Sequence, residues 1–349
     1  MTRYLVLRLA WGVVLFLALT LVVFFLFFVL PSDPLRIGRA SSVADTVEVR
    51  DAYRLEGPLL QEYGEFVWGV VRHGDLGRSV GNGREVRDIL IQAAPVTASL
   101  VIGGAVIWLG IALPVGIMAA LRPRSLIDRA STVFVLIGIS AHPVWIGLIL
   151  SYFFGYRLGW FPFSNYCDFI NPAPGATCGG PVQWAYHLML PWFTLAFLFA
   201  ALYSRMIRAN VLETLEEEYV RTARAKGLSE AVVVRSHVLR NSLLSVVTML
   251  GMDIGIAFGG AVFVETVFSL PGLGQLVLPA LRRQDLPILI GLVLVVTTAI
   301  IVFNLIVDLV YARLDPRIRL VGHSAGRLDR RRPRLRAAAA SAVSTTRQP

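Results

Sequence analysis

Six long runs of apolar residues constrain this chain more than any other feature of its sequence. A helix needs roughly 20 apolar residues to cross the hydrocarbon core of a bilayer. The runs reach or approach that length, and they lie near residues 9–30, 96–121, 130–154, 188–203, 242–268 and 286–311. Only 16% of the residues are charged, whereas a soluble domain carries roughly a quarter. The sequence therefore predicts an all-α membrane protein with about six transmembrane helices.

Two of these runs depart from a typical transmembrane helix. The fourth is short unless Trp184 and Tyr186 extend it as interfacial anchors. The first follows Arg3 and Arg8, as the apolar part of a secretory signal would. It exceeds the roughly 7 to 15 residues of a signal core and lacks a clear small-residue cleavage site. We therefore expect it to be a retained transmembrane helix.

The distribution of basic residues predicts the orientation. Placing the N-terminus inside puts most of the arginines in inner segments, chiefly 205–240 and the region after residue 312. The long outer segment 31–94 mixes both signs of charge and weighs little, because the positive-inside rule applies to short loops. Both termini are therefore predicted to be cytoplasmic. This topology explains the net charge of +10 better than nucleic-acid binding does, and no nucleic-acid partner is expected.

The chain divides into three predicted parts. Residues 1–94 hold the first transmembrane helix and an extracytoplasmic segment. Residues 95–315 form the helical core, with a cytoplasmic loop at about 205–241. Residues 316–349 are rich in arginine and then in small residues, which predicts a disordered cytoplasmic tail. Within the outer segment, apolar residues from 55 to 70 recur with helical spacing, which suits either an amphipathic helix on the outer leaflet or bundle, or a docking surface for an external protein.

The only two cysteines, Cys167 and Cys178, fall in an outer loop rich in Pro, Gly and Asn. An oxidising exterior permits a disulfide between them, and closing so short a loop stabilises it by roughly 3 kcal/mol. Free thiols are the alternative. Two sulfurs without further Cys or nearby His fall short of four metal ligands, so no metal site is expected.

Signatures of several enzyme classes are absent. A phosphate-binding P-loop ends in Lys followed by Ser or Thr, but the sole lysine, Lys226, is followed by Gly227 and Leu228. The sequence contains no H-E-x-x-H zinc motif. A G-x-S-x-G pattern occurs at 322–326 (GHSAG), but it lies in the basic tail that is predicted to be disordered and not in the strand–turn–helix that a nucleophile elbow requires. We therefore expect neither catalysis nor a bound cofactor in this chain.

The inner stretch 216–230 predicts two short helices joined by a sharp turn. Its three leading glutamates favour a helix N-terminus, and Arg224 and Lys226 favour a C-terminus. Gly227 can adopt the left-handed conformation that ends a helix, and Ser229 is expected to cap the next one.

This turn suits a lever pressed into a partner. Ala223 and Ala225 are small and would let another surface approach closely. An ordinary solvated loop is the alternative interpretation.

This stretch resembles the coupling loop of ABC importer permeases, whose pattern is E-A-A, three residues, and G. Ala223 and Gly227 fit that pattern, whereas Arg221 and Thr222 stand where Glu and Ala are usual. The variant resembles the B-type permease subunit of dipeptide, oligopeptide and nickel importers. Further matches run in order along residues 1–320, namely LPSDP at 30–34, GDLGRS at 74–79, RLGWFP at 157–162 and VETVFSLPGLGQL at 264–276.

The resemblance implies a type I ABC importer permease fold in a bacterial cytoplasmic membrane. It also implies a homologous C-type permease, two cytoplasmic ATPases that use ATP and Mg²⁺, and an external solute-binding protein as partners. Peptides are the expected cargo, with nickel chelates or other small solutes as alternatives. Coupling to the ATPases would fall on Glu218, Arg221, Thr222, Ala223, Arg224, Lys226, Gly227 and Leu228.

The fifth apolar run carries the other candidate residues. Gly251, Gly255 and Gly259 are spaced four apart, which permits close helix packing in lipid. Asp253 lies in the same run and Glu265 near its outer end, and a carboxylate in lipid is costly unless it serves a pore, a partner helix or an interface. Both are candidates for the substrate path or gate, together with Pro271 and Gly272. A secondary transporter using the two carboxylates as proton sites is the competing hypothesis.

Overall fold

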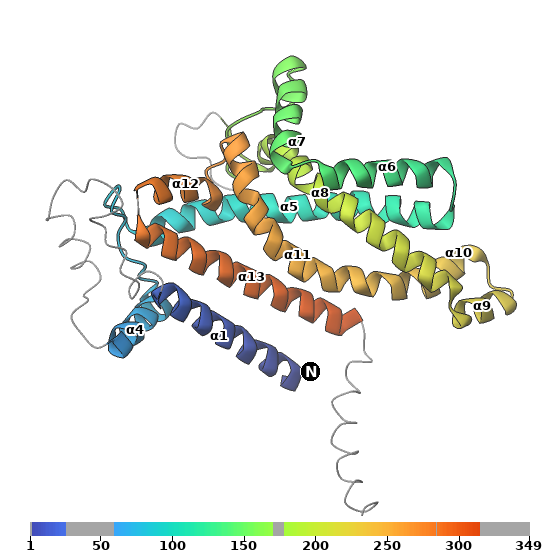
Figure 1. Ribbon diagram of the computed structural model, residues 1–349, viewed down its shortest axis with the longest axis horizontal. Helices are drawn as coiled ribbons and strands as arrows, with labels where there is room; N and C mark the ends of the chain where they lie inside the picture. Colours follow the sequence, from blue (N-terminus) through green and yellow to red (C-terminus); the bar gives the residue numbers. More distant parts are fainter. Residues whose placement is uncertain (1, 26–58, 170–177, 284, 315–349) are drawn as a thin grey trace, which may run out of the picture.

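The fold is an elongated bundle of helices (Figure 1). A computed structural model describes residues 2–25, 59–169, 178–283 and 285–314. Within these ranges the regular structure is helical, apart from one isolated β-bridge between Arg78 and Glu85. The predicted tail, 316–349, and much of the predicted outer segment lie outside the described residues.

Five of the helices are long and apolar enough to cross a membrane, or up to six spans if one bent pair counts as a span. The long helices are α1 (Thr2–Phe24), α5 (Val86–Leu121), α8 (Pro181–Glu216), α11 (Leu239–Phe268) and α13 (Leu286–Leu314). The bent pair consists of α6 (Leu126–Ser140), followed by α7 (Pro143–Leu150) and the π-helix η3 (Ser151–Arg157). Shorter elements are α4 (Leu59–Trp68), η2 (Gly69–His73), α9 (Glu218–Ala225), α10 (Glu230–Val232), η4 (Val233–Val238) and α12 (Leu273–Arg283). The predicted all-α, multi-span architecture is confirmed.

The third apolar run is not the continuous helix that we expected. Its two halves meet at 106°, and the break falls at Ala141 and His142, whose backbones are extended (ψ 119° and 138°). Pro143 explains the break, because proline disfavours the helical conformation of the residue before it. The ring of His142 then accepts a hydrogen bond from the Val144 amide at 3.3 Å and caps α7.

The fourth run is longer than its apolar stretch suggested. Helix α8 spans 36 residues, because it starts before the apolar stretch and continues beyond it through Arg205 and Arg208 towards the coupling segment. The predicted boundary at residue 94 likewise falls inside α5, which begins at Val86.

The core lies mainly between α5 and α8, where small residues admit large ones. The indole of Trp192 packs on Gly103, which has no room for a Cβ, and its Nε1 donates to the Ser99 carbonyl at 2.9 Å. Trp108 is fully buried and stacks on Phe199 with ring centroids 4.6 Å apart. Such close backbone approach is the usual way for helices to associate in lipid.

Helix α1 joins this core at its edge. Its contacts with the bundle run through α13, and Arg8 pairs with Asp308 at 3.0 Å. At the other end of α1, the hydroxyl of Tyr63 on α4 donates to the Leu17 carbonyl at 3.0 Å. Helix α4, in the described part of the predicted outer segment, therefore packs on the bundle.

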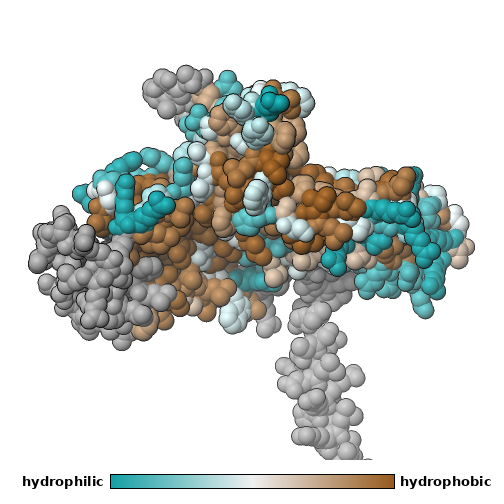
Figure 2. Space-filling view, turned by 45° about the horizontal axis from the view of Figure 1, so that its top comes forward, coloured by the Kyte–Doolittle hydropathy of each residue, from teal (hydrophilic) through white to brown (hydrophobic). Residues whose placement is uncertain are grey.

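The two ends of the bundle carry different elements. Helices α9 and α10 lie at one end, and α4 and α12 lie at the opposite end (Figure 1). Figure 2 shows hydrophobic surface across the middle of the molecule, with hydrophilic residues gathered towards both ends. This distribution is the one expected for a bundle that spans a bilayer.

Candidate functional site

The stretch from Glu217 to Val238 forms a hairpin of short helices, which we call the α9 hairpin. Glu216 ends α8, Glu217 has an extended backbone (φ −62°, ψ 143°), and Glu218 begins α9. The three glutamates therefore do not open one helix: Glu216 ends α8, Glu217 links the two helices, and Glu218 opens α9. After the turn, α10 and η4 lead into α11 without a break. The hairpin thus joins two membrane-crossing helices, α8 and α11.

Gly227 makes the turn of this hairpin. Its φ of +79° lies in the left-handed region, and its amide donates to the Arg224 carbonyl at 2.9 Å. A Cβ at this position would meet nothing within 4 Å, so the backbone conformation alone favours glycine. Ser229 occupies the N-cap position of α10, but its side chain makes no capping hydrogen bond, so the predicted side-chain cap is wrong.

One face of α9 packs against the rest of the chain. Val220 is fully buried and Ala223 is 5% exposed, and both belong to the main core together with Val233 and Val238 of η4. Ala223 therefore serves packing within the hairpin, and our expectation that it offers an external surface is wrong. Ala225 is exposed and stays available. This packing makes the hairpin one body with the adjoining ends of α8 and α11.

The opposite face of α9 is open to solvent and strongly polar. The Arg224 guanidinium clamps the Glu230 carboxylate across the turn through two hydrogen bonds of 3.1 and 2.6 Å, and this partner raises the pKa of Arg224. The remaining predicted coupling residues are exposed beside the pair, namely Glu218, Arg221, Thr222, Lys226 and Leu228. The structure therefore gathers these residues on one rigid protrusion.

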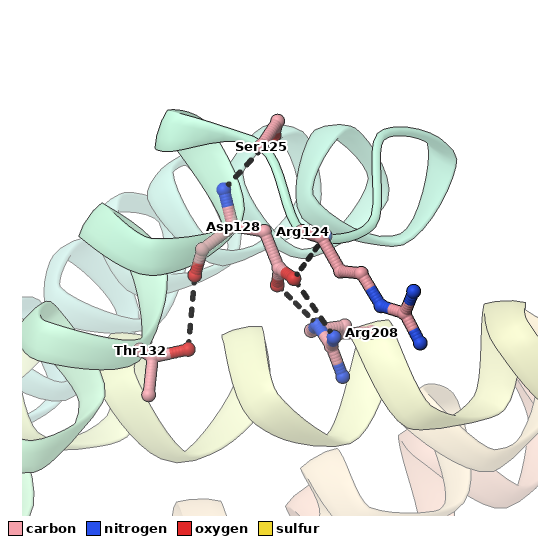
Figure 3. A network of polar contacts seen from close by, with 5 residues as sticks. All are labelled: Arg124, Ser125, Asp128, Thr132 and Arg208. Atoms are coloured by element: carbon pink, nitrogen blue, oxygen red, sulfur yellow. Dashed lines mark hydrogen bonds and ion pairs between the residues drawn. The ribbon is translucent and has the colours of Figure 1, made fainter.

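An ion pair that the sequence did not reveal braces the helix behind this hairpin (Figure 3). Arg208 of α8 binds both carboxylate oxygens of Asp128, at 2.6 and 3.1 Å. Asp128 also accepts from the Arg124 amide at 2.9 Å, while its own amide donates to Ser125 at 3.3 Å. The spacing of Ser125 and Asp128 matches a capping box, which was the available signal. The pair ties the α5–α6 turn to α8 two turns before its end.

A second buried carboxylate organises the turn between α11 and α12. Glu265 is fully buried and accepts from Thr97 at 2.6 Å and from the Gly274 amide at 2.7 Å. A Cβ on Gly272 would overlap this carboxylate, which explains the glycine. Pro271 is exposed beside it. The Glu265 side chain therefore contacts the turn and not an open path in this conformation.

Helix α11 also contains the glycine series and Asp253. A Cβ on Gly251 would lie 3.0 Å from Asn304, and one on Gly255 would lie 3.4 Å from Ile300, so these two glycines pack against α13. Gly259 is exposed with nothing near it and is not part of that seam. Asp253 points to the other side of α11, where the Tyr203 hydroxyl donates to its Oδ2 at 2.7 Å.

The two cysteines are joined in the structure. Cys167 and Cys178 form a disulfide with an S–S distance of 2.04 Å, and the imidazole Nδ1 of His187 lies 3.2 Å from the Cys167 sulfur. The two sulfurs and the His187 ring lie close together. Because cysteines in a disulfide offer no thiolates, this arrangement does not provide a metal centre.

Together, these features define the class of protein as a helical membrane subunit. It has a rigid polar hairpin at one end and a closed turn at the other. Comparison with known proteins narrows the class. Residues 112–320 match the model of the binding-protein-dependent transport system inner membrane component, and residues 1–101 match the N-terminal model of the same kind of component.

Named relatives agree with these matches. A Brucella suis protein provisionally named a peptide permease is 38% identical over 326 residues, covering 92% of this chain and 100% of the relative. The dipeptide transport system permease protein of Escherichia coli K12 is 34% identical over 337 residues, covering 91% and 99%. A crystal structure of an amino acid ABC transporter shows 14% identity with a TM-score of 0.48, covering 65% of this chain and 94% of that one.

The chain therefore belongs to the inner-membrane component family of binding-protein-dependent transport systems. It is a permease subunit of an ABC importer and a multi-pass protein of the inner membrane. The resemblance found in the sequence is confirmed.

Proposed function

We propose that this chain forms half of the translocation pathway of an ATP-driven importer of peptides. Peptides are supported by the names of its relatives, which include a dipeptide permease and a provisionally named peptide permease. Nickel chelates and other small solutes remain the alternative cargo. The other half of the pathway is a homologous C-type permease, and an extracytoplasmic binding protein delivers the solute.

The α9 hairpin is the element that receives the energy. Two ATPase subunits bind ATP and Mg²⁺ in the cytoplasm, and one of them holds the exposed face of α9 in a groove. The observation that carries this proposal is the hairpin's construction, with an exposed polar face from Glu218 to Leu228 and a buried face of Val220 and Ala223. A force applied to such a protrusion moves α8 and α11 as rigid elements, as alternating access requires.

This role sets the orientation of the chain. The α9 hairpin lies on the cytoplasmic side, α12 lies on the outer side, and both termini are cytoplasmic. The opposite positions of α9 and α12 in the bundle support this orientation (Figure 1), as does the density of basic residues around the hairpin. The loop that carries the Cys167–Cys178 disulfide is then outside, where such bonds persist.

The turn after α11 is the outer gate. Glu265 holds this turn in its closed form through the Thr97 hydroxyl and the Gly274 amide, and Pro271 and Gly272 shape it. Glu265 acts by positioning the turn. A proton-driven mechanism through Glu265 is less well supported, because its side chain is fully buried and hydrogen-bonded.

Reconstitution tests the proposed function. The chain is placed in proteoliposomes with its partner permease, two ATPases and a loaded binding protein, and uptake of a radiolabelled dipeptide is measured. We expect uptake that requires ATP and stops when the P-loop lysine of the ATPases is replaced. Uptake driven by an ion gradient without the ATPases would instead establish the secondary transporter.

A further inference from the structure

Most carboxylates within or beside the long apolar helices of the described residues already have partners. Asp128, Glu265 and Asp285 are buried, at 7%, 0% and 2% exposure. Four carboxylates have such partners: Arg208 pairs with Asp128, Arg8 pairs with Asp308, Thr97 and two backbone amides bind Glu265, and Ser79 and the Gly81 amide bind Asp285. These four groups are therefore committed to the fold.

Asp253 differs from all of them. It lies at the midpoint of α11, which runs from Leu239 to Phe268. Its only hydrogen bond within the described chain is the one from Tyr203 to Oδ2, and no Arg, Lys or His of the described residues forms an ion pair with it. The side chain is half-buried. Placing a carboxylate near the middle of a membrane span with no cation beside it costs free energy. Such a residue is therefore a candidate for a functional site.

The environment of Asp253 leaves its carboxylate accessible. An exposed stripe runs along α11 with steps of three and four residues, formed by Met249, Met252, Ile256, Gly259 and Phe263. Asp253 lies at the border between this stripe and the buried positions Ile254 and Ala257. The carboxylate therefore lies at the edge of the side of α11 that the other described residues leave uncovered.

Tyr203 fixes the position of this carboxylate. Its ring is 2% exposed and lies 6.1 Å, centroid to centroid, from the buried Trp108. Because Trp108 in turn stacks on Phe199, the hydroxyl donor is held by a rigid aromatic cluster. The Tyr203 hydroxyl donates to Oδ2 of Asp253, whereas Oδ1 accepts no hydrogen bond from the described residues and is available to another donor.

We propose that Asp253 is a binding site for a cationic group of the transported solute, and that for a peptide this group is the α-ammonium. The assignment rests on the proposed function, because it takes the exposed stripe of α11 to line the pathway. Among the groups that every free peptide carries whatever its side chains, the α-ammonium is the one that both neutralises a carboxylate and donates to it. Tyr203 is the positioning residue, since it acts on the solute only through Asp253.

A basic residue of the partner permease is the competing occupant, and a thiol assay separates the two. Both native cysteines are in the disulfide, so Ile256→Cys provides a single free thiol one turn from Asp253. In the assembled complex, we compare its reaction with a cationic and an anionic methanethiosulfonate of similar size. An uncompensated charge one turn away favours the cationic reagent by a few-fold to about a hundredfold, depending on the local dielectric.

We expect Asp253→Asn to abolish this preference at position 256. Phe263→Cys is the control, because it lies ten residues beyond Asp253 on α11, and its ratio of cationic to anionic reaction should depend little on Asp253. A thiol at 256 that never prefers the cationic reagent would show that Asp253 is already neutralised, and would overturn the proposal.

Transport provides the second arm. With binding protein loaded to a measured, equal occupancy, we expect Asp253→Asn to reduce import of a free-amine dipeptide roughly ten- to hundredfold. We expect Asp253→Glu to retain more import than Asp253→Asn, and Tyr203→Phe to lower it less than Asp253→Asn. Assembly of each variant is checked by co-purification with the partner subunits. Normal import by an assembled Asp253→Asn complex would overturn the proposal, whereas a wild-type complex without ATP-dependent import would overturn the proposed function itself.

Discussion

Replacing Gly227 tests whether the α9 hairpin transmits force through its backbone geometry. The residue has φ +79°, a conformation that costs a residue with a Cβ roughly 1 to 2 kcal/mol, and a β-branched residue more. Because a Cβ there meets nothing within 4 Å, no internal clash adds to this cost. Gly227→Val should therefore distort the turn and leave the membrane core folded.

The assay measures ATP hydrolysis and dipeptide uptake in the same proteoliposomes and reports their ratio. We expect Gly227→Val to hydrolyse ATP with little uptake and Gly227→Ala to fall between Val and wild type. Gly227→Asn is the matched control, since asparagine tolerates the left-handed region, and it should remain coupled. Normal coupling by the valine variant would refute the reasoning, as would an asparagine variant that fails as completely as valine.

The remaining predictions concern other parts of the same account. Arg224→Glu should uncouple hydrolysis from uptake by breaking the clamp on Glu230, and the double variant Arg224→Glu/Glu230→Arg should recover part of the uptake if the pair matters for geometry. Asp128→Asn should lower the melting temperature of the detergent-solubilised protein, because Arg208 then loses its charged partner; a melting temperature equal to that of wild type would contradict a bracing role. Gly272→Ala should destabilise the outer turn by about 1 to 3 kcal/mol, since its Cβ overlaps the Glu265 carboxylate, and protease sensitivity of that turn in right-side-out vesicles measures the effect. The cysteines should resist thiol labelling until a reductant is added, and replacing both by serine should cost about 3 kcal/mol of loop stability; full labelling without reductant would rule the disulfide out.

The sequence predicted the features that depend on short-range pattern. Apolar runs identified the membrane-crossing helices, since the length of such a run is set by bilayer thickness. The φ of Gly227 followed from residue type and local spacing. The bend at His142 was within reach, because Pro143 disfavours a helical residue before it, but proline is also tolerated inside membrane helices, as Pro114 in α5 shows.

Short-range sequence patterns could not predict the contacts between residues that are far apart in the chain. Arg208 meets Asp128 across 80 positions, and Thr97 meets Glu265 across 168. Neither pair shares a local signal, because each forms only when the helices pack. The same limit explains Ala223, whose small side chain suited an external contact equally well until its burial against η4 was known.

The most direct test of the account uses Lys226, the only lysine of the chain, which is exposed beside the turn of the α9 hairpin. A membrane-impermeant amine reagent is applied to intact spheroplasts and to inside-out vesicles, with and without the ATPase subunits, and modification of the Lys226 peptide is read by mass spectrometry. The account predicts no modification in spheroplasts, strong modification in stripped inside-out vesicles, and protection when the ATPases are bound. Modification from the outside, or modification that the ATPases do not change, would contradict the claim that energy enters through this hairpin.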